Sequence, residues 1–192
     1  MHLRLLAVGA VLLGGVTGCA ADGPKYPILG TTDVCSLFDR AVLTAAVPDG
    51  QVRGSALDDV EGSNGNYGYC EFSNVMGTFP ADRDFAVLRL EIRKYASEED
   101  FVNRHWAQDD LGGTCQNFMN GAYAEGATAP VDQWCASTRE DNDGVPDYYY
   151  YFAARRDTVK VTAYYVYPLA KPAAEVEHIH AVTRVAAESA FR

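Results

Sequence analysis

Residues 16–19 read Val-Thr-Gly-Cys and carry the clearest chemistry in the chain, because this pattern ends the signal peptide of bacterial lipoproteins. The thiol of Cys19 would accept a diacylglycerol group before the peptide bond on its amino side is cut. The apolar run before it is too short to span a bilayer, which takes about 20 residues. We therefore expect a lipoprotein signal peptide over residues 1–18, a lipidated tether over 19–32, and attachment to the extracytoplasmic face of the cell membrane through acyl chains such as palmitate.

Four further cysteines could form two disulfide bonds. They are Cys35, Cys70, Cys115 and Cys135. An even number in an exported chain favours disulfides, and no pair shows the C-x₂-C spacing of a structural zinc site. Four cysteines allow three connectivities, of which we expect Cys35–Cys70 with Cys115–Cys135, two loops that follow one another in the sequence. Thiols bonded in this way cannot act as nucleophiles, which argues against a cysteine-dependent enzyme.

Tyrosines are concentrated in an expected hairpin with strands at 147–155 and 158–167. If its loop has an even number of residues, one face carries the phenols together with Lys160, and the other face carries apolar core residues. The candidate binding residues on the first face are Tyr149, Tyr151, Thr162 and Tyr164. Aromatic rings with hydrogen-bonding tips suit recognition of a ligand or partner. Tyrosine also has a high strand propensity and coats half-buried sheets, so both interpretations stay open.

Metal and acid–base candidates are weaker. Residues 141–147 resemble part of a calcium-binding loop, but Arg139 occupies the preceding alternate position, which favours an acidic hairpin turn. His178 and His180 point about 200° apart on a helix, which favours ion pairs with neighbouring glutamates over a shared metal. His105 lies on an apolar stripe, where a buried, hydrogen-bonded histidine is expected. Without a recognisable catalytic motif, we expect no catalytic residue, no metal and no cofactor.

The charge balance restricts the partners. Arg4 is the one charged residue before Cys19, so the 16 basic and 26 acidic residues of the chain leave 15 and 26 after processing, a formal charge of −11. This balance argues against nucleic acid, which requires a basic surface. It also argues against electrostatic docking on anionic lipids, which leaves the acyl chains as the membrane attachment.

Hydrophobic periodicity predicts the elements that position these residues. Helices are expected from residue 33 to the Pro48-Asp49-Gly50 stop, over 97–110 before Gly112-Gly113, and from Pro172 onward. Strands are expected at 69–72, 85–95, 133–140, 147–155 and 158–167, whereas 51–67 and 120–130 are rich in turn formers. We expect a single α+β domain over residues 33–192. It would consist of an antiparallel sheet of about five to six strands, helices packed on one face and two disulfides.

Two segments carry a family resemblance. Residues 33–38 read Asp-Val-Cys-Ser-Leu-Phe, and residues 69–72 read Tyr-Cys-Glu-Phe. The chain resembles small actinobacterial surface lipoproteins of an uncharacterised family that open with a Cys-Ser/Ala-Leu-Leu helix and place a second cysteine in a strand. It is distantly similar to the extracellular sensor domain of a mycobacterial Ser/Thr kinase, which has two disulfides and a large cleft. The resemblance covers residues 1–74, with Phe38 where leucine is frequent, and it implies no catalytic residues.

These observations predict a lipid-anchored extracytoplasmic binding or accessory module of the bacterial envelope. Its partner would be a small envelope ligand or another envelope protein. The alternative is an envelope hydrolase or transferase with an unrecognised active site. A buried pocket holding an acid–histidine pair would favour the enzyme, an aromatic-lined cleft without such a pair would favour binding, and a structural spacer would have no cleft.

Overall fold

The computed structural model describes residues 33–54, 56–59, 65–75, 85–95, 100–141, 147–169 and 171–191. Cys19, the tether and residues 142–146 of the acidic turn lie outside these residues. In chain order the elements are η1 (Val34–Leu37), α1 (Arg40–Ala46), β1 (Gln51–Gly54), β2 (Asp58–Asp59), β3 (Gly65–Ser73), β4 (Val87–Tyr95), α2 (Asp100–Phe118), β5 (Ala122–Gly126), β6 (Gln133–Asp141), β7 (Asp147–Arg156), β8 (Val159–Pro168) and α3 (Ala173–Ser189).

One antiparallel sheet contains all the strands in the described part of the chain, in the order β1-β3-β4-β8-β7-β6-β5, with β2 beside β3. The α+β class and the antiparallel sheet are therefore confirmed. The five long strands β3, β4, β6, β7 and β8 correspond to the five predicted strands, although β3 is longer than the predicted 69–72. The short strands β1, β2 and β5 add to the expected number. They lie in the segments 51–67 and 120–130, where turn-forming residues obscure the alternation.

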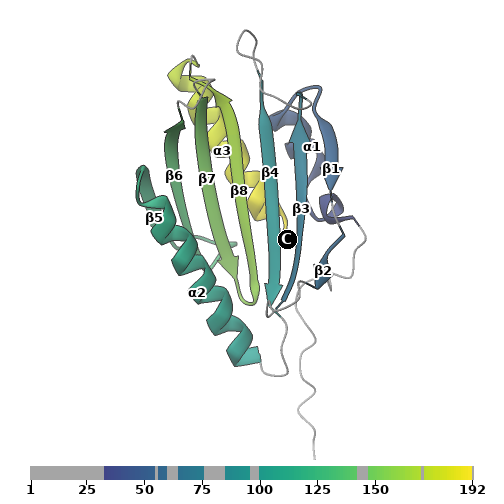
Figure 1. Ribbon diagram of the computed structural model, residues 1–192, viewed down its shortest axis with the longest axis vertical. Coiled ribbons are helices and arrows are strands. Elements are labelled where there is room, and N and C mark those ends of the chain that lie inside the picture. The colour runs from purple at the N-terminus through teal and green to yellow at the C-terminus, as the bar shows by residue number, and fades with distance from the viewer. Residues whose placement is uncertain are drawn as a thin grey trace, which may run out of the picture.

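The helices occupy both faces of the sheet, which differs from the expected arrangement (Figure 1). On one face, α1 and α3 cover the main apolar core, and the Tyr165 hydroxyl donates a hydrogen bond to the Ala46 carbonyl at 2.6 Å. On the other face, α2 crosses the sheet, and Phe118 near its end packs against Tyr151 of β7. Because α2 spans part of this second face, strands β3 and β4 keep a half-exposed polar surface beside it.

The expected first helix is divided into two short helices. Asp33 caps η1 by accepting a hydrogen bond from the Cys35 amide, and Phe38 is extended. Asp39 then starts α1 by accepting from the amides of Ala41 and Val42. A second N-cap residue inside the apolar pattern therefore explains the break, since an aspartate carboxylate satisfies the free amides of a new helix.

Helix α2 continues past Gly112 and Gly113, which the sequence predicted to end it. Its buried stripe extends through Ala107 and Leu111, and Cys115 lies one turn further on. The disulfide from Cys115 to Cys135 of β6 fixes this part of the helix to the sheet. Packing of the last turns and the covalent link therefore outweigh the low helix propensity of the two glycines.

Both predicted disulfides are present. Cys35–Cys70 joins η1 to β3 with a Cα–Cα distance of 4.8 Å, and Cys115–Cys135 joins α2 to β6 with 5.8 Å. Each bond connects a helix to a strand, so each fixes a helix on a different face of the sheet. Within the described ranges, no helix combines the length and apolar character needed to cross a membrane.

Candidate binding surfaces

The four candidate residues of the hairpin lie together on the face that carries α2. In the β7–β8 register Tyr151 lies opposite Tyr164, and Thr162 lies opposite Ala153, so the predicted sharing of a face is confirmed. The ring centroids of Tyr149 and Tyr151 are 5.9 Å apart, and those of Tyr151 and Tyr164 are 6.1 Å apart. We call Tyr149, Tyr151, Thr162 and Tyr164 the tyrosine surface. All four side chains are partly exposed.

Part of each ring is used in packing. Phe118 of α2 approaches Tyr151 with a centroid distance of 5.1 Å. Tyr149 and Tyr164 pack against a small apolar cluster formed by Val75, Phe85, Val87 and Val166. Burial raises the pKa of Tyr164, so its hydroxyl is a neutral hydrogen-bonding group throughout the physiological range. The tyrosine surface is therefore a half-buried aromatic layer with polar tips.

Arg89 of β4 extends this layer toward β3 and was not among the predicted site residues. Its guanidinium carbon lies 4.4 Å from the ring centroid of Tyr69 and 5.8 Å from that of Tyr164. It is also ion-paired with Glu91 at 3.1 Å and with Glu71 at 3.9 Å. An arginine over aromatic rings gains cation–π stabilisation, which is typical of recognition surfaces and also of structural networks. Alternation in 85–95 placed Arg89 on a polar face, but only the β4–β8 pairing brings it to Tyr164.

Two small cavities flank the tyrosine surface. A cavity of about 180 Å³ is lined by Tyr151 with Phe118, Ser137 and Arg139 among others. A second cavity of about 120 Å³ is lined by Thr162 with Tyr67, Arg93 and Lys160 among others. Pockets that enclose a drug-sized ligand measure roughly 300–1,000 Å³, so these hollows fit single groups of a larger partner.

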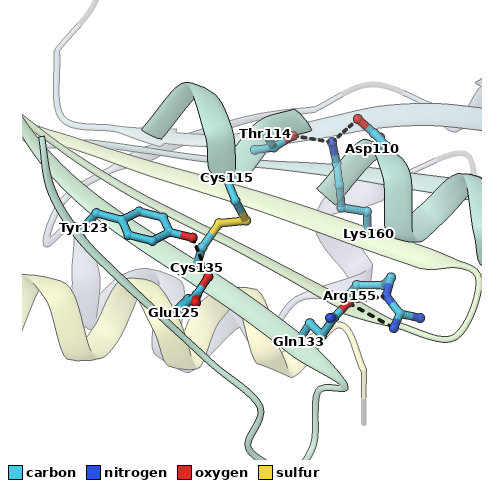
Figure 2. Close-up of a disulfide and its surroundings, with 9 residues drawn as sticks. All are labelled: Asp110, Thr114, Cys115, Tyr123, Glu125, Gln133, Cys135, Arg155 and Lys160. Carbon is cyan, nitrogen blue, oxygen red and sulfur yellow. Dashed lines mark hydrogen bonds and ion pairs between the residues drawn. A yellow bond between two sulfur atoms is a disulfide. The ribbon is translucent and has the colours of Figure 1, made fainter. Parts of the chain in front are cut away.

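A polar network beside the second cavity ties α2 to the sheet. The Asp110 carboxylate accepts from Lys160 Nζ at 2.7 Å and from the Tyr95 hydroxyl at 2.5 Å, and Arg93 lies 3.4 Å away. Lys160 also donates to the Thr114 hydroxyl at 3.0 Å (Figure 2). Burial opposes ionisation of Asp110, but the hydrogen bonds from Lys160 and Tyr95 prevail and lower its pKa. The network keeps α2 in place with a charged pair that is mostly buried.

A much larger groove, of about 950 Å³, lies between the outer side of α2 and strand β5. The helix contributes Asp109, Gly112, Gly113 and Met119, and the strand contributes Tyr123, Glu125 and Gly126. The Tyr123 hydroxyl donates to Glu125 at 2.8 Å, and the Cys115–Cys135 bond lies beside this pair (Figure 2). We call this the α2–β5 groove. The sequence pattern predicted a helix end on one side of this groove and a turn-rich segment on the other, so the groove was not predicted.

The two glycines in the groove are unusual for a helix interior. A Cβ atom built at Gly112 or Gly113 would meet nothing within 4 Å outside the helix. Neither packing nor helix geometry therefore requires glycine at these positions. Each glycine costs about 0.5–1 kcal/mol relative to alanine in a helix. The two glycines therefore make α2 less stable than alanine would at the point where the helix borders the groove.

The histidines do not form a catalytic arrangement in the described residues. No histidine lines any of the three cavities. His105 was expected to be buried, but its side chain is 62% exposed and lies 3.3 Å from Asp109, because the buried stripe of α2 runs through Asn103, Ala107 and Leu111 instead. His180 was expected on the surface, but it stacks on Tyr150 with a centroid distance of 3.9 Å.

In the part of the chain that the structure describes, no cluster of three or more His, Cys, Asp or Glu side chains could hold a metal ion. The acidic turn at 142–146 falls outside that part. The features available for binding on the described surfaces are thus aromatic rings, paired charges and an open groove.

Comparison with protein families, curated proteins and solved structures found no match to this chain.

Proposed function

We propose that this protein is a lipid-anchored extracytoplasmic binding or accessory module of the bacterial envelope, related to the actinobacterial lipoproteins that its first 74 residues resemble. The observation that carries the binding role is the tyrosine surface with Arg89 above it. Half-exposed phenols and an arginine are the residue types enriched at protein interfaces. The Val-Thr-Gly-Cys pattern at residues 16–19 supports the anchoring, and the two disulfides are consistent with an oxidising compartment.

The shape of the tyrosine surface favours a macromolecular partner. The two flanking cavities are small, so a ligand bound here would remain mostly outside them. A partner that lies across β4, β8 and β7 could place one group in each cavity and stack on the exposed parts of the rings. Another envelope protein meets this description better than a small enclosed ligand.

Replacement of Tyr149, Tyr151 and Tyr164 by serine tests the binding role. We expect the folded triple variant to recover its envelope partners at about one tenth of the wild-type amount in pull-downs from solubilised membranes, because truncation removes the aromatic contacts. The matched control is Tyr148→Ser, which changes the opposite face of the same strand. Circular dichroism confirms folding of each variant. Equal recovery by the triple variant and the control would refute the proposed surface.

Mass spectrometry of the membrane-extracted protein tests the anchoring. The expected N-terminus is Cys19 carrying a diacylglycerol and, in many lipoproteins, an amide-linked acyl chain. The Cys19→Ala variant should leave the membrane fraction. An intact leader with an unmodified Cys19 thiol would rule out this attachment while leaving the tyrosine surface to be judged by the pull-down.

A further inference from the structure

We propose that the α2–β5 groove binds an extended cationic segment of a partner protein, with lysine or arginine side chains directed to the two acidic walls. This site uses residues separate from the tyrosine surface and lies beyond the function proposed above. The triple tyrosine variant should therefore leave it unchanged, so the two proposals can fail independently.

The shape of the groove suits a chain that enters and leaves. Its volume is about 950 Å³, and it is open to solvent along α2. Gly112 and Gly113 leave the helical wall without side chains, and nothing in the described structure occupies the space that a Cβ would fill. A main chain can therefore approach the helix closely at this point, which a side chain at either position would prevent.

The charge of the lining residues identifies the partner's chemistry. Asp109 stands on the helical wall and Glu125 on the strand wall, whereas no lysine or arginine lines the groove. Their described partners are His105 and the Tyr123 hydroxyl, so neither acid is neutralised by a lysine or arginine side chain. Two arginines contact lining residues, and both are paired with acids. Arg155 hydrogen-bonds to Gln133 and is ion-paired with Asp132, whereas Arg184 stacks on Trp134 and is ion-paired with Glu188. Complementary charge thus favours a basic segment.

An apolar contact is available beside the acids. Met119 lines the groove at the end of α2 and is 59% exposed. A flexible thioether adapts to varied side chains, which suits a segment recognised by its charge and extended shape. A second copy of this chain is a poor occupant, because the formal charge of −10 makes two copies repel each other.

Fluorescence anisotropy with a labelled peptide tests the proposal. The probe is a twelve-residue peptide of alternating lysine and threonine, and the reference is the same peptide with glutamate in place of lysine, each added to the full chain in detergent. We expect saturable binding of the basic peptide only. Glu125→Lys should weaken it about tenfold or more, and the affinity should decrease with added salt.

Two further variants separate the groove from general acidity. Gly113→Leu fills the groove from a position where a Cβ meets no neighbour, so it should weaken binding about tenfold without lowering the melting temperature. Glu177→Lys makes the same charge change on an exposed part of α3 and should change the affinity less than about twofold. Equal affinity for both peptides, or equal losses in Glu125→Lys and Glu177→Lys, would overturn the proposal. So would a dimer in sedimentation that Gly113→Leu dissociates.

Discussion

The carboxylate of Asp110 contacts hydrogen-bond donors from two strands. Lys160 comes from β8, while Tyr95 and Arg93 come from β4. Its neighbour Asp109 lines the α2–β5 groove, and its described ion pair is with the exposed His105. Two consecutive aspartates of one helix therefore have different roles, because one faces the sheet and the other faces the groove. The side-chain exposure of 23% for Asp110 and 63% for Asp109 expresses this difference.

The amide variants of these two aspartates should separate the roles. Asp110→Asn removes the charge that Lys160 requires and should lower the free energy of unfolding by about 1.5–3 kcal/mol. Asp109→Asn breaks a solvent-exposed pair and should cost less than about 0.5 kcal/mol. Urea unfolding followed by circular dichroism measures both. Equal midpoints for the two variants would contradict a stabilising role for the Asp110 network.

In helix α2, local propensity and tertiary contacts favour different structures. The helix keeps its regular course through Gly112 and Gly113 because the disulfide at Cys115 and the buried Leu111 hold the turns on either side. The glycines thus destabilise α2 without ending it. By contrast, Gly126 of β5 is required by packing, since a Cβ there would lie 2.9 Å from the indole ring of Trp134.

Alanine at these glycines should have opposite effects. Gly113→Ala should raise the free energy of unfolding by about 0.5–1 kcal/mol, because it lowers the entropy of the unfolded chain and clashes with nothing. Gly126→Ala should lower the unfolding free energy, because the indole ring must shift. Thermal unfolding of the two variants beside the wild type measures the difference. A destabilised Gly113→Ala would show that the glycine serves the fold itself.

Some elements of the fold could be predicted from the sequence, and others could not. Alternation in 85–95 was sufficient to predict β4. The hairpin of β7 and β8 followed from its tyrosine-rich strands, and an even loop length gave the shared face of Tyr151 and Tyr164. The disulfide pairs followed from compartment and loop order. The placement of α2 on the second face could not be predicted. It depends on long-range contacts such as the ion pair between Asp110 and Lys160, which lie 50 positions apart in the sequence. The α2–β5 groove depends on that placement and was hidden for the same reason.

At the scale of the whole molecule, stability should depend on pH in two windows. Burial against Tyr150 lowers the pKa of His180, and the charge of Glu177 only partly offsets this effect. The unfolded chain therefore takes up a proton at about pH 6.5, before the folded protein does, and stability decreases as the pH falls below this value. Asp110 has a lowered pKa, so its contribution is lost only in a second, more acidic window, below about pH 4.

His180→Phe tests the first window. Phenylalanine retains a ring to stack on Tyr150 but cannot be protonated, so the decrease in melting temperature between about pH 7 and 5 should become smaller. The matched control, His178→Phe on the exposed side of α3, should keep the wild-type slope. The second window should be unchanged in both variants. An identical slope in His180→Phe and wild type would assign the pH dependence to other groups.

The Cys35–Cys70 bond also determines how the domain carries mechanical load. Cys35 lies in η1, and Cys70 lies in β3, which is flanked by β1 and β4 within the sheet. A pull applied to the chain before Cys35 would pass through sulfur directly into this inner strand. The elements between the two cysteines, including α1 and the edge strand β1, would be bypassed. The load would therefore enter the sheet at β3, which is hydrogen-bonded to a strand on each side.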